Sequence, residues 1–244
     1  MSNFNWSLFM NELPITMVGV FIECVALLVC YVIRDRTAFT ATIMVNVFVT
    51  TIYATKQIDW AGMPSLPGQM AMVSAMLGLG LCYGIMGKEC TYKVWRSVVF
   101  GLLLLFFWTH RFDLQDDIPG YDVAEHYRNS LPTTVRPALA VLGSFIYIGA
   151  FLQIGWNWLS HQPPWLAYTL TMVSASLVGA VEFVLVGFYG SNEITAPVQD
   201  LIISVFTFRL WCLVMFMPFV IGLIHLNHHR SLSDVKREAS TDYG

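Results

Sequence analysis

Residues 165–190 read WLAYTLTMVSASLVGAVEFVLVGFYG, and this run decides the class of fold. It is almost wholly apolar, and its single charged residue is Glu182. A helix of about 20 apolar residues matches the hydrocarbon thickness of a bilayer. The residues do not alternate in polarity, as the strands of a membrane barrel must. We therefore predict that this run is a membrane-spanning helix.

The composition of the whole chain agrees with that interpretation. Of the 244 residues, 56% are hydrophobic and only 12% are charged, whereas a soluble domain has about 25% charged residues. These values exclude a soluble globular domain and a disordered chain. The net charge of -3 argues against a nucleic-acid binder, which would carry a basic face. The five cysteines lie in or beside apolar runs without a CxxC pair, so we expect packing roles for them.

Six more apolar runs accompany the first one. Helices satisfy their own backbone within lipid, so we predict an all-α integral membrane protein. Its single domain, residues 1–244, would be a bundle of about seven transmembrane helices. The fourth run is short, and we expect it to be tilted or partly recessed. The predicted spans are residues 16–33, 39–55, 69–86, 94–108, 137–159, 165–190 and 197–226.

The basic residues predict the orientation of the chain in the membrane. If the spans alternate in direction, eight of the thirteen Lys and Arg residues fall on one side and four on the other. Cytoplasmic segments carry an excess of Lys and Arg. We therefore expect a multi-pass protein of a bacterial inner (plasma) membrane, with an external loop at 109–136 and a cytoplasmic tail at 227–244. The eight residues are Arg34, Arg36, Lys88, Lys93, Arg96, Arg230, Lys236 and Arg237.

Three charged residues lie inside the predicted spans, namely Glu23, Glu182 and Arg209. Charge within a bilayer is costly and usually faces a cavity or a partner. Glu182 and Arg209 belong to consecutive antiparallel spans, and at about 1.5 Å per residue their depths differ by roughly 7 Å. Their long side chains can bridge that difference. The pair is therefore either a polar ligand site near the midplane or an ion pair that joins two helices.

A histidine cluster gives a weaker signal at the end of the last span. His225, His228 and His229 form an HxxHH pattern, similar to one histidine box of the membrane di-iron desaturases. The other interpretation is an interfacial cluster at a helix C-terminus, where imidazolium suits the dipole. The chain has no GxSxG, HExxH or P-loop motif. We therefore expect a protein that is not an enzyme and that has no metal and no cofactor.

From Asn46 onward, ordered motifs resemble the vitamin uptake transporter family, whose characterised members take up queuosine precursors. The resemblance covers about 180 residues, and it would make the first span an N-terminal addition to a six-span fold. The matching positions are Asn46 with Lys56, Met86-Gly87-Lys88 for the family's YGKK, Arg136, Tyr147, Gln153, Trp156, Ser174, Glu182, Phe188-Tyr189-Gly190, Arg209 and Pro218. The departures are Gly80 and Gly84 in place of an acidic pair, Met86 in place of tyrosine and Gln153 in place of aspartate.

This resemblance implies a transporter that imports a flat 7-deazapurine, such as 7-cyano-7-deazaguanine, 7-aminomethyl-7-deazaguanine or queuine. Carboxylate, amide and guanidinium groups would receive its polar edges, and aromatic rings would stack on its plane. The expected substrate-binding residues are Glu182, Arg209, Asn46, Gln153, Ser174, Trp156 and Phe183. We expect lipid and substrate as partners and no nucleic acid. The alternatives are another vitamin or nucleoside-like permease and a membrane metalloenzyme that uses the HxxHH cluster. The sequence leaves open the coupling mechanism and whether the protein forms a homo-oligomer.

Overall fold

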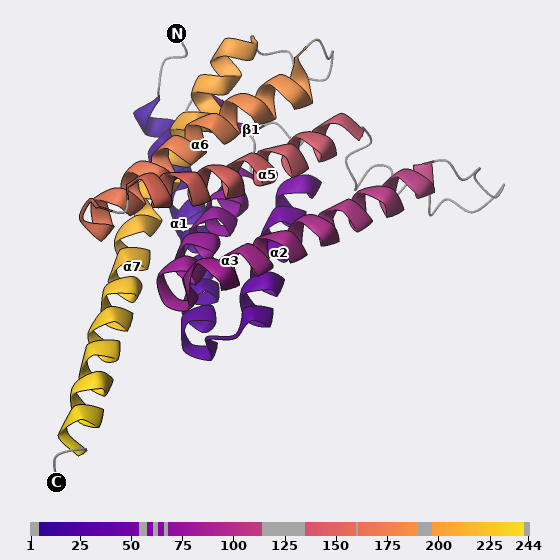
Figure 1. Ribbon diagram of the computed structural model, residues 1–244. Coiled ribbons are helices and arrows are strands. Elements are labelled where there is room, and N and C mark those ends of the chain that lie inside the picture. Colours follow the sequence, from indigo (N-terminus) through magenta and orange to yellow (C-terminus); the bar gives the residue numbers. More distant parts are fainter. Residues whose placement is uncertain are drawn as a thin grey trace.

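The structure, a computed structural model, describes residues 5–53, 58–60, 63–65, 68–113, 135–159, 161–189 and 197–241 (Figure 1). Helices dominate the fold, and one short antiparallel hairpin of two strands lies between the second and third helices. In chain order the elements are α1 (Trp6–Ile33), α2 (Arg36–Ile52), β1 (Ile58–Trp60), β2 (Met63–Ser65), α3 (Gln69–Asp113), α5 (Val135–Trp158), α6 (Pro164–Phe188) and α7 (Val198–Thr241).

Helix α3 is two helices that meet at Gly87. This residue has φ 81° and ψ 177°, a conformation that glycine adopts without steric cost. The chain therefore turns sharply between residues 69–86 and 88–113 (Figure 1). With α3 counted as two, the described part contains seven helices. The third and fourth predicted spans are thus separate helices, as expected, but they are joined by a bend and not by a loop.

With α3 counted as one element, five helices in the described residues are long and apolar enough to cross a membrane, and this confirms a multi-pass helical membrane protein. Helix α2 is apolar but has 17 residues, so it falls short of the usual length. The apolar segments of the five are Thr16–Ile33, Gln69–Phe107, which contains the bend, Ala138–Trp158, Trp165–Phe188 and Val198–His228.

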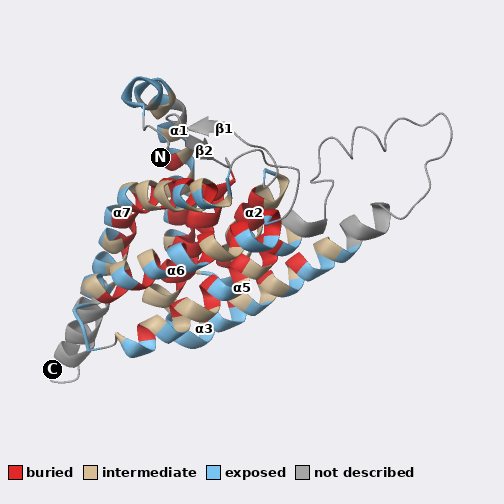
Figure 2. Ribbon diagram, turned by 90° about the horizontal axis from the view of Figure 1, so that it is seen from above, coloured by how far each residue is buried: buried red, intermediate tan, exposed pale blue. Residues whose placement is uncertain are grey.

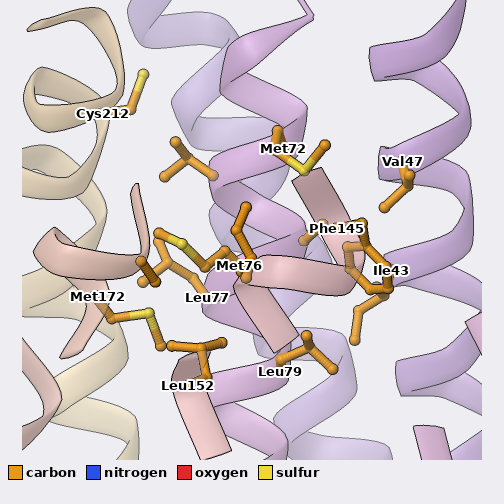
Figure 3. Close-up of a cluster of buried hydrophobic side chains, with 14 of the residues drawn as sticks. Ile43, Val47, Met72, Met76, Leu77, Leu79, Phe145, Leu152, Met172 and Cys212 are labelled. Atoms are coloured by element: carbon orange, nitrogen blue, oxygen red, sulfur yellow. The ribbon is translucent and has the colours of Figure 1, made fainter. Parts of the chain in front are cut away.

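The first limb of α3 is the centre of the bundle. Residues 71–82 are all buried, and α3 packs against α1, α2, α5, α6 and α7. Buried residues gather in the middle of the bundle (Figure 2). Side chains of this limb, including Met72 and Met76, meet residues of α2, α5 and α6 in one apolar core (Figure 3). Large apolar side chains such as Phe21 and Phe100 are instead exposed, as expected on surfaces that face lipid.

Short-range capping explains how α1 passes into α2. Arg34 adopts a left-handed conformation with φ 52°, which ends α1. The Asp35 carboxylate then accepts a hydrogen bond from the backbone N–H of Thr37 at 3.0 Å and so caps α2. The two helices are therefore joined by a tight turn that carries two arginines.

Several basic segments gather at one end of the bundle. Arg36 donates to Ser97 Oγ at 3.1 Å, and Lys88 donates to Asn157 Oδ1 at 3.2 Å. A Cβ on Gly84 would lie 2.8 Å from Ile224 Cγ1, so α7 passes the bend of α3 at this level. The α1–α2 turn, the bend, the end of α5 and the later part of α7 thus share an end, as alternating spans require.

Several predicted boundaries differ from the structure. The second helix is Arg36–Ile52 and not 39–55, and the fourth run, predicted to be short, belongs to the longer limb 88–113 of α3. Helix α7 continues to Thr241, so most of the segment predicted as a tail from residue 227 is helical. Its Lys, Arg, Glu and Ala residues are good helix formers, and a helix need not end where its apolar run ends. The predicted external loop 109–136 is shorter, because α3 reaches Asp113 and α5 begins at Val135. Residues 114–134 lie outside the described part of the chain.

Candidate functional site

The side chain of Arg209 lies in the interior of the bundle. It projects from α7 and is only 1% exposed. Its Nε donates to Gln69 Oε1 at 2.6 Å, and its Nη1 donates to the backbone oxygen of Ser176 at 3.2 Å. Its Nη2 is buried and has no hydrogen-bond partner among the described residues. A guanidinium therefore sits among neutral acceptors, with one of its nitrogens unused.

Gln69 and Ser176 complete the surroundings of this guanidinium. Gln69 opens α3 and is fully buried, so the start of the central limb meets the middle of α7. Its Nε2 and the hydroxyl of Ser176 are also buried, and neither has a hydrogen-bond partner in the described part of the chain. Sequence reasoning placed Gln69 at the start of the third span but overlooked it as a site residue, because a neutral side chain at the end of an apolar run carries no sign of a buried charged partner.

Glu182 lies on α6 and is half-buried. Its Oε2 is buried with no hydrogen-bond partner within the described ranges, and its Oε1 lies against the backbone of α5 at Gly143. Glu182 and Arg209 interact electrostatically, although no hydrogen bond or ion pair joins them in the described part of the chain. The two charges therefore share one region without neutralising each other by direct contact. We refer to Gln69, Ser176, Glu182 and Arg209 as the Arg209 cluster.

Small residues allow the helices around this cluster to approach closely. Ser144 on α5 donates to the backbone oxygen of Gly179 on α6 at 3.0 Å. A Cβ on Gly179 would lie 3.0 Å from Arg209 Nη1 and 2.8 Å from Ile148 Cδ1. Small-residue contacts of this kind are typical of packed membrane helices. Here they also leave the space that the guanidinium occupies.

Asn46 belongs to a different polar group. Its Nδ2 donates to Glu23 Oε2 at 3.0 Å and to Ser74 Oγ at 3.1 Å, and Ser74 Oγ donates to the same Glu23 oxygen at 2.7 Å. Ser74 follows Gln69 by five residues, which is about 7.5 Å along α3 and places the two on nearly opposite sides of the helix. The central limb therefore separates Asn46 from Arg209. We call Glu23, Asn46 and Ser74 the Glu23 network.

Trp156, the aromatic candidate on α5, lies far from the place where the Glu182 carboxylate rests against that helix. Trp156 stacks on Tyr83, with ring centroids 4.1 Å apart, and its ring also lies 6.5 Å from that of Tyr168. It follows Gly143 by thirteen residues, about 20 Å along α5. Trp156 is therefore near the end of the bundle that carries Lys88, and not beside the Arg209 cluster.

The other three candidates named from the sequence are Phe183, Gln153 and Ser174. Phe183 is fully buried, and its ring packs edge-on against Phe188 with centroids 5.5 Å apart. Gln153 is half-buried and makes no hydrogen bond to another described residue. Ser174 is exposed on α6, whereas Ser176 faces the interior. Of the seven residues named from the sequence, the structure therefore brings Glu182 and Arg209 to one region and Asn46 to another.

The predicted histidine cluster is described only in part. His225 and His228 lie near the end of the apolar part of α7, and the side chain of His229 lies outside the described residues. Within the residues that the structure describes, no group of three or more His, Cys, Asp or Glu side chains could hold a metal ion.

No protein-family model, no curated protein and no solved structure matches this chain.

Proposed function

We propose that this protein is a membrane transporter that binds a small, flat and polar heterocycle at the Arg209 cluster. Its buried atoms without partners carry the proposal: Arg209 Nη2, Gln69 Nε2, Ser176 Oγ and Glu182 Oε2. Buried polar groups in proteins are normally hydrogen-bonded. Each one left unpaired costs about 1–3 kcal/mol. A ligand with complementary groups would offset that cost, so the cluster favours ligand binding over a purely structural ion pair.

The kinds of atom limit the chemistry of the ligand. Arg209 and Gln69 offer N–H donors, Glu182 offers a carboxylate acceptor, and Ser176 offers a hydroxyl that can do either. The matching ligand has a carbonyl next to N–H groups, which is the arrangement on the edge of a guanine-like ring. The planar guanidinium of Arg209 also suits a flat partner.

A 7-deazapurine satisfies these requirements, and the family resemblance implies the same class. We therefore propose 7-cyano-7-deazaguanine, 7-aminomethyl-7-deazaguanine or queuine as the imported compound. The basic end of the bundle, which includes Arg36 and Lys88, would face the cytoplasm of a bacterium. Import would then run from the end at which α7 begins toward this basic end.

Uptake of labelled 7-aminomethyl-7-deazaguanine or queuine tests the proposal. The host is a bacterial strain that neither makes queuosine precursors nor has its own importer for them. Cells that express the wild type should accumulate label. Arg209→Ala and Glu182→Gln should lower uptake at least about tenfold, since a hydrogen bond to a charged group contributes about 1.5–3 kcal/mol. Ser174→Ala, on the exposed side of the same helix as Glu182, is the matched control and should transport normally.

Membrane insertion of every variant is measured in parallel, by quantifying the protein in washed membranes. Absence of uptake by a correctly inserted wild type would overturn the proposed substrate. Normal uptake by both Arg209→Ala and Glu182→Gln would overturn the proposed site. Binding measurements on the purified protein with guanine, nicotinamide riboside and the 7-deazapurines would then identify another heterocycle, if one binds.

A further inference from the structure

The Glu23 network joins three helices through oxygen-bearing side chains. Glu23 comes from α1, Asn46 from α2 and Ser74 from the central limb of α3. Both neighbours donate to Glu23 Oε2, at 3.0 Å from Asn46 and 2.7 Å from Ser74. Asn46 and Ser74 are buried, whereas Glu23 is only half-buried. The carboxylate is therefore held from one side and approachable from the other.

The charge of Glu23 needs compensation. The segment that contains it is apolar enough to cross a membrane, and both of its hydrogen-bond partners are neutral. An ionised side chain within a bilayer normally pairs with an opposite charge or marks the path of an ion. The network thus calls for a cation.

We propose that Glu23, Asn46 and Ser74 form a Na⁺-binding site. Carboxylate, amide and hydroxyl oxygens are the ligands that hard cations prefer. Rotation of the Asn46 side-chain amide by half a turn brings its carbonyl oxygen to the place of its NH₂ group. All three side chains can then offer an oxygen ligand. Thr50 lies one turn beyond Asn46 and donates to the backbone oxygen of Gly68 at 3.0 Å, which ties α2 to the start of α3.

The site is placed to couple Na⁺ to transport. Ser74 and Gln69 lie on the same limb of α3, which carries the Glu23 network on one side and the Arg209 cluster on the other. A shift of this rigid limb when Na⁺ binds would reach Gln69 directly, since a packed helix moves as a unit. This coupling role rests on the proposed transport function, whereas Na⁺ binding itself does not.

Thermal unfolding of the purified full-length protein tests Na⁺ binding without any 7-deazapurine present. NaCl is titrated against KCl at constant ionic strength and pH. The wild type should unfold at a higher temperature in Na⁺ than in K⁺, because an ion that binds only the folded state stabilises it. Glu23→Gln should lose this difference. Ser74→Ala, a smaller change, should raise the Na⁺ concentration at half-effect at least about tenfold, the result of losing about 1.4 kcal/mol of binding.

Glu89→Gln, at an exposed position outside both the Glu23 network and the Arg209 cluster, is the matched control and should keep the full response to Na⁺. The melting temperature of Glu23→Gln in KCl shows whether that variant folds. If it does not fold, Ser74→Ala carries the test. Equal melting of the wild type in Na⁺ and K⁺ would overturn the proposal, and so would a Na⁺ response retained in both Glu23→Gln and Ser74→Ala. A response that shifts with pH and ignores Na⁺ would assign the network to protons and equally overturn the sodium site.

Proteoliposome uptake separates this proposal from the transport function. An inward Na⁺ gradient should raise the initial rate of 7-deazapurine uptake in the wild type and not in Ser74→Ala. Na⁺ binding without any uptake would contradict the transport proposal alone. If Na⁺ binds but the initial rate of uptake does not depend on the Na⁺ gradient, the coupling role alone is overturned.

Discussion

Arg209 on α7 donates its Nε to the side-chain oxygen of Gln69, the first residue of α3, over 2.6 Å and across 140 positions of the chain. This hydrogen bond orients a buried guanidinium in the middle of the bundle. Because the second terminal atom of Gln69, Nε2, has no hydrogen-bond partner in the part of the chain that the structure describes, the amide is fixed at one end only. The same contact therefore positions Arg209 and leaves a donor beside it for a ligand.

Removal of this contact should destabilise the protein. Gln69→Leu keeps a side chain of similar size but deprives a buried cation of one of its two acceptors. We expect a loss of about 1.5–3 kcal/mol in the free energy of unfolding, the usual range for a hydrogen bond to a charged group. Denaturant titration in mixed micelles measures it. Gln153→Leu is the control, since Gln153 is half-buried and makes no hydrogen bond to another described residue. Equal effects of the two substitutions would contradict the role given to Gln69.

The charges of the candidate site could be found from the sequence, but their surroundings could not. Glu182 and Arg209 stand out because charge is rare in apolar runs. Gln69 and Ser176 are neutral and common, so only the fold identifies them as neighbours of Arg209. The resemblance pointed to Ser174. Ser176 lies two positions later, and residues two positions apart on a helix point in directions about 200° apart. Ser174 therefore faces outward and Ser176 inward.

The helices, like the charges of the site, could be predicted from the sequence, whereas their connections could not. The length of each apolar run predicts a helix, because lipid offers no partner for the backbone. How the runs connect depends on single residues: the sharp bend of α3 depends on the φ of Gly87, which the glycine-rich sequence around it does not single out. Asn46 shows the same limit. Its place beside Glu23 and apart from Arg209 follows from the central position of α3, which composition does not reveal.

A substitution at Gly143 should disturb Glu182 selectively. A Cβ at this position would overlap Glu182 Oε1, so Gly143→Ala pushes the carboxylate away from its place against α5. We expect uptake of the 7-deazapurine to fall at least about tenfold, as for loss of the carboxylate itself. The assay is uptake per molecule of inserted protein. Gly222→Ala provides the control, because a Cβ there meets nothing within 4 Å. Unchanged uptake in well-inserted Gly143→Ala would show that the position of Glu182 is unimportant.

The bend of α3 should depend on glycine at residue 87. A Cβ at Gly87 would meet no atom within 4 Å, so the effect of Gly87→Ala comes from the backbone alone. With φ 81° the alanine is strained by about 1–3 kcal/mol. The free energy of unfolding should fall by that amount, and membrane levels should drop. Glu89→Ala, at an exposed position two residues later, should have little effect. A Gly87→Ala variant as stable as the wild type would contradict the bend.

Substitutions of Trp156 distinguish a role in packing from a role in ligand binding. Its ring stacks on Tyr83, the residue is 5% exposed, and its indole N–H has no hydrogen-bond partner among the described residues. Trp156→Phe keeps an aromatic ring and removes an unpaired N–H, so we expect a stability change below about 1.5 kcal/mol. Trp156→Ala opens a cavity and should cost about 3–5 kcal/mol.

Because Trp156 lies about 20 Å along α5 from Gly143, where the Glu182 carboxylate rests, Trp156→Phe should bind and transport the 7-deazapurine normally. Titration of the purified variant with ligand measures this independently of stability. Trp158→Ala, in which a 77% exposed ring is removed, controls for loss of a tryptophan from the same end of α5. A folded Trp156→Phe protein that no longer binds ligand would move the binding site from the Arg209 cluster to the tryptophan stack, and the position of the substrate in the bundle would have to be reassigned.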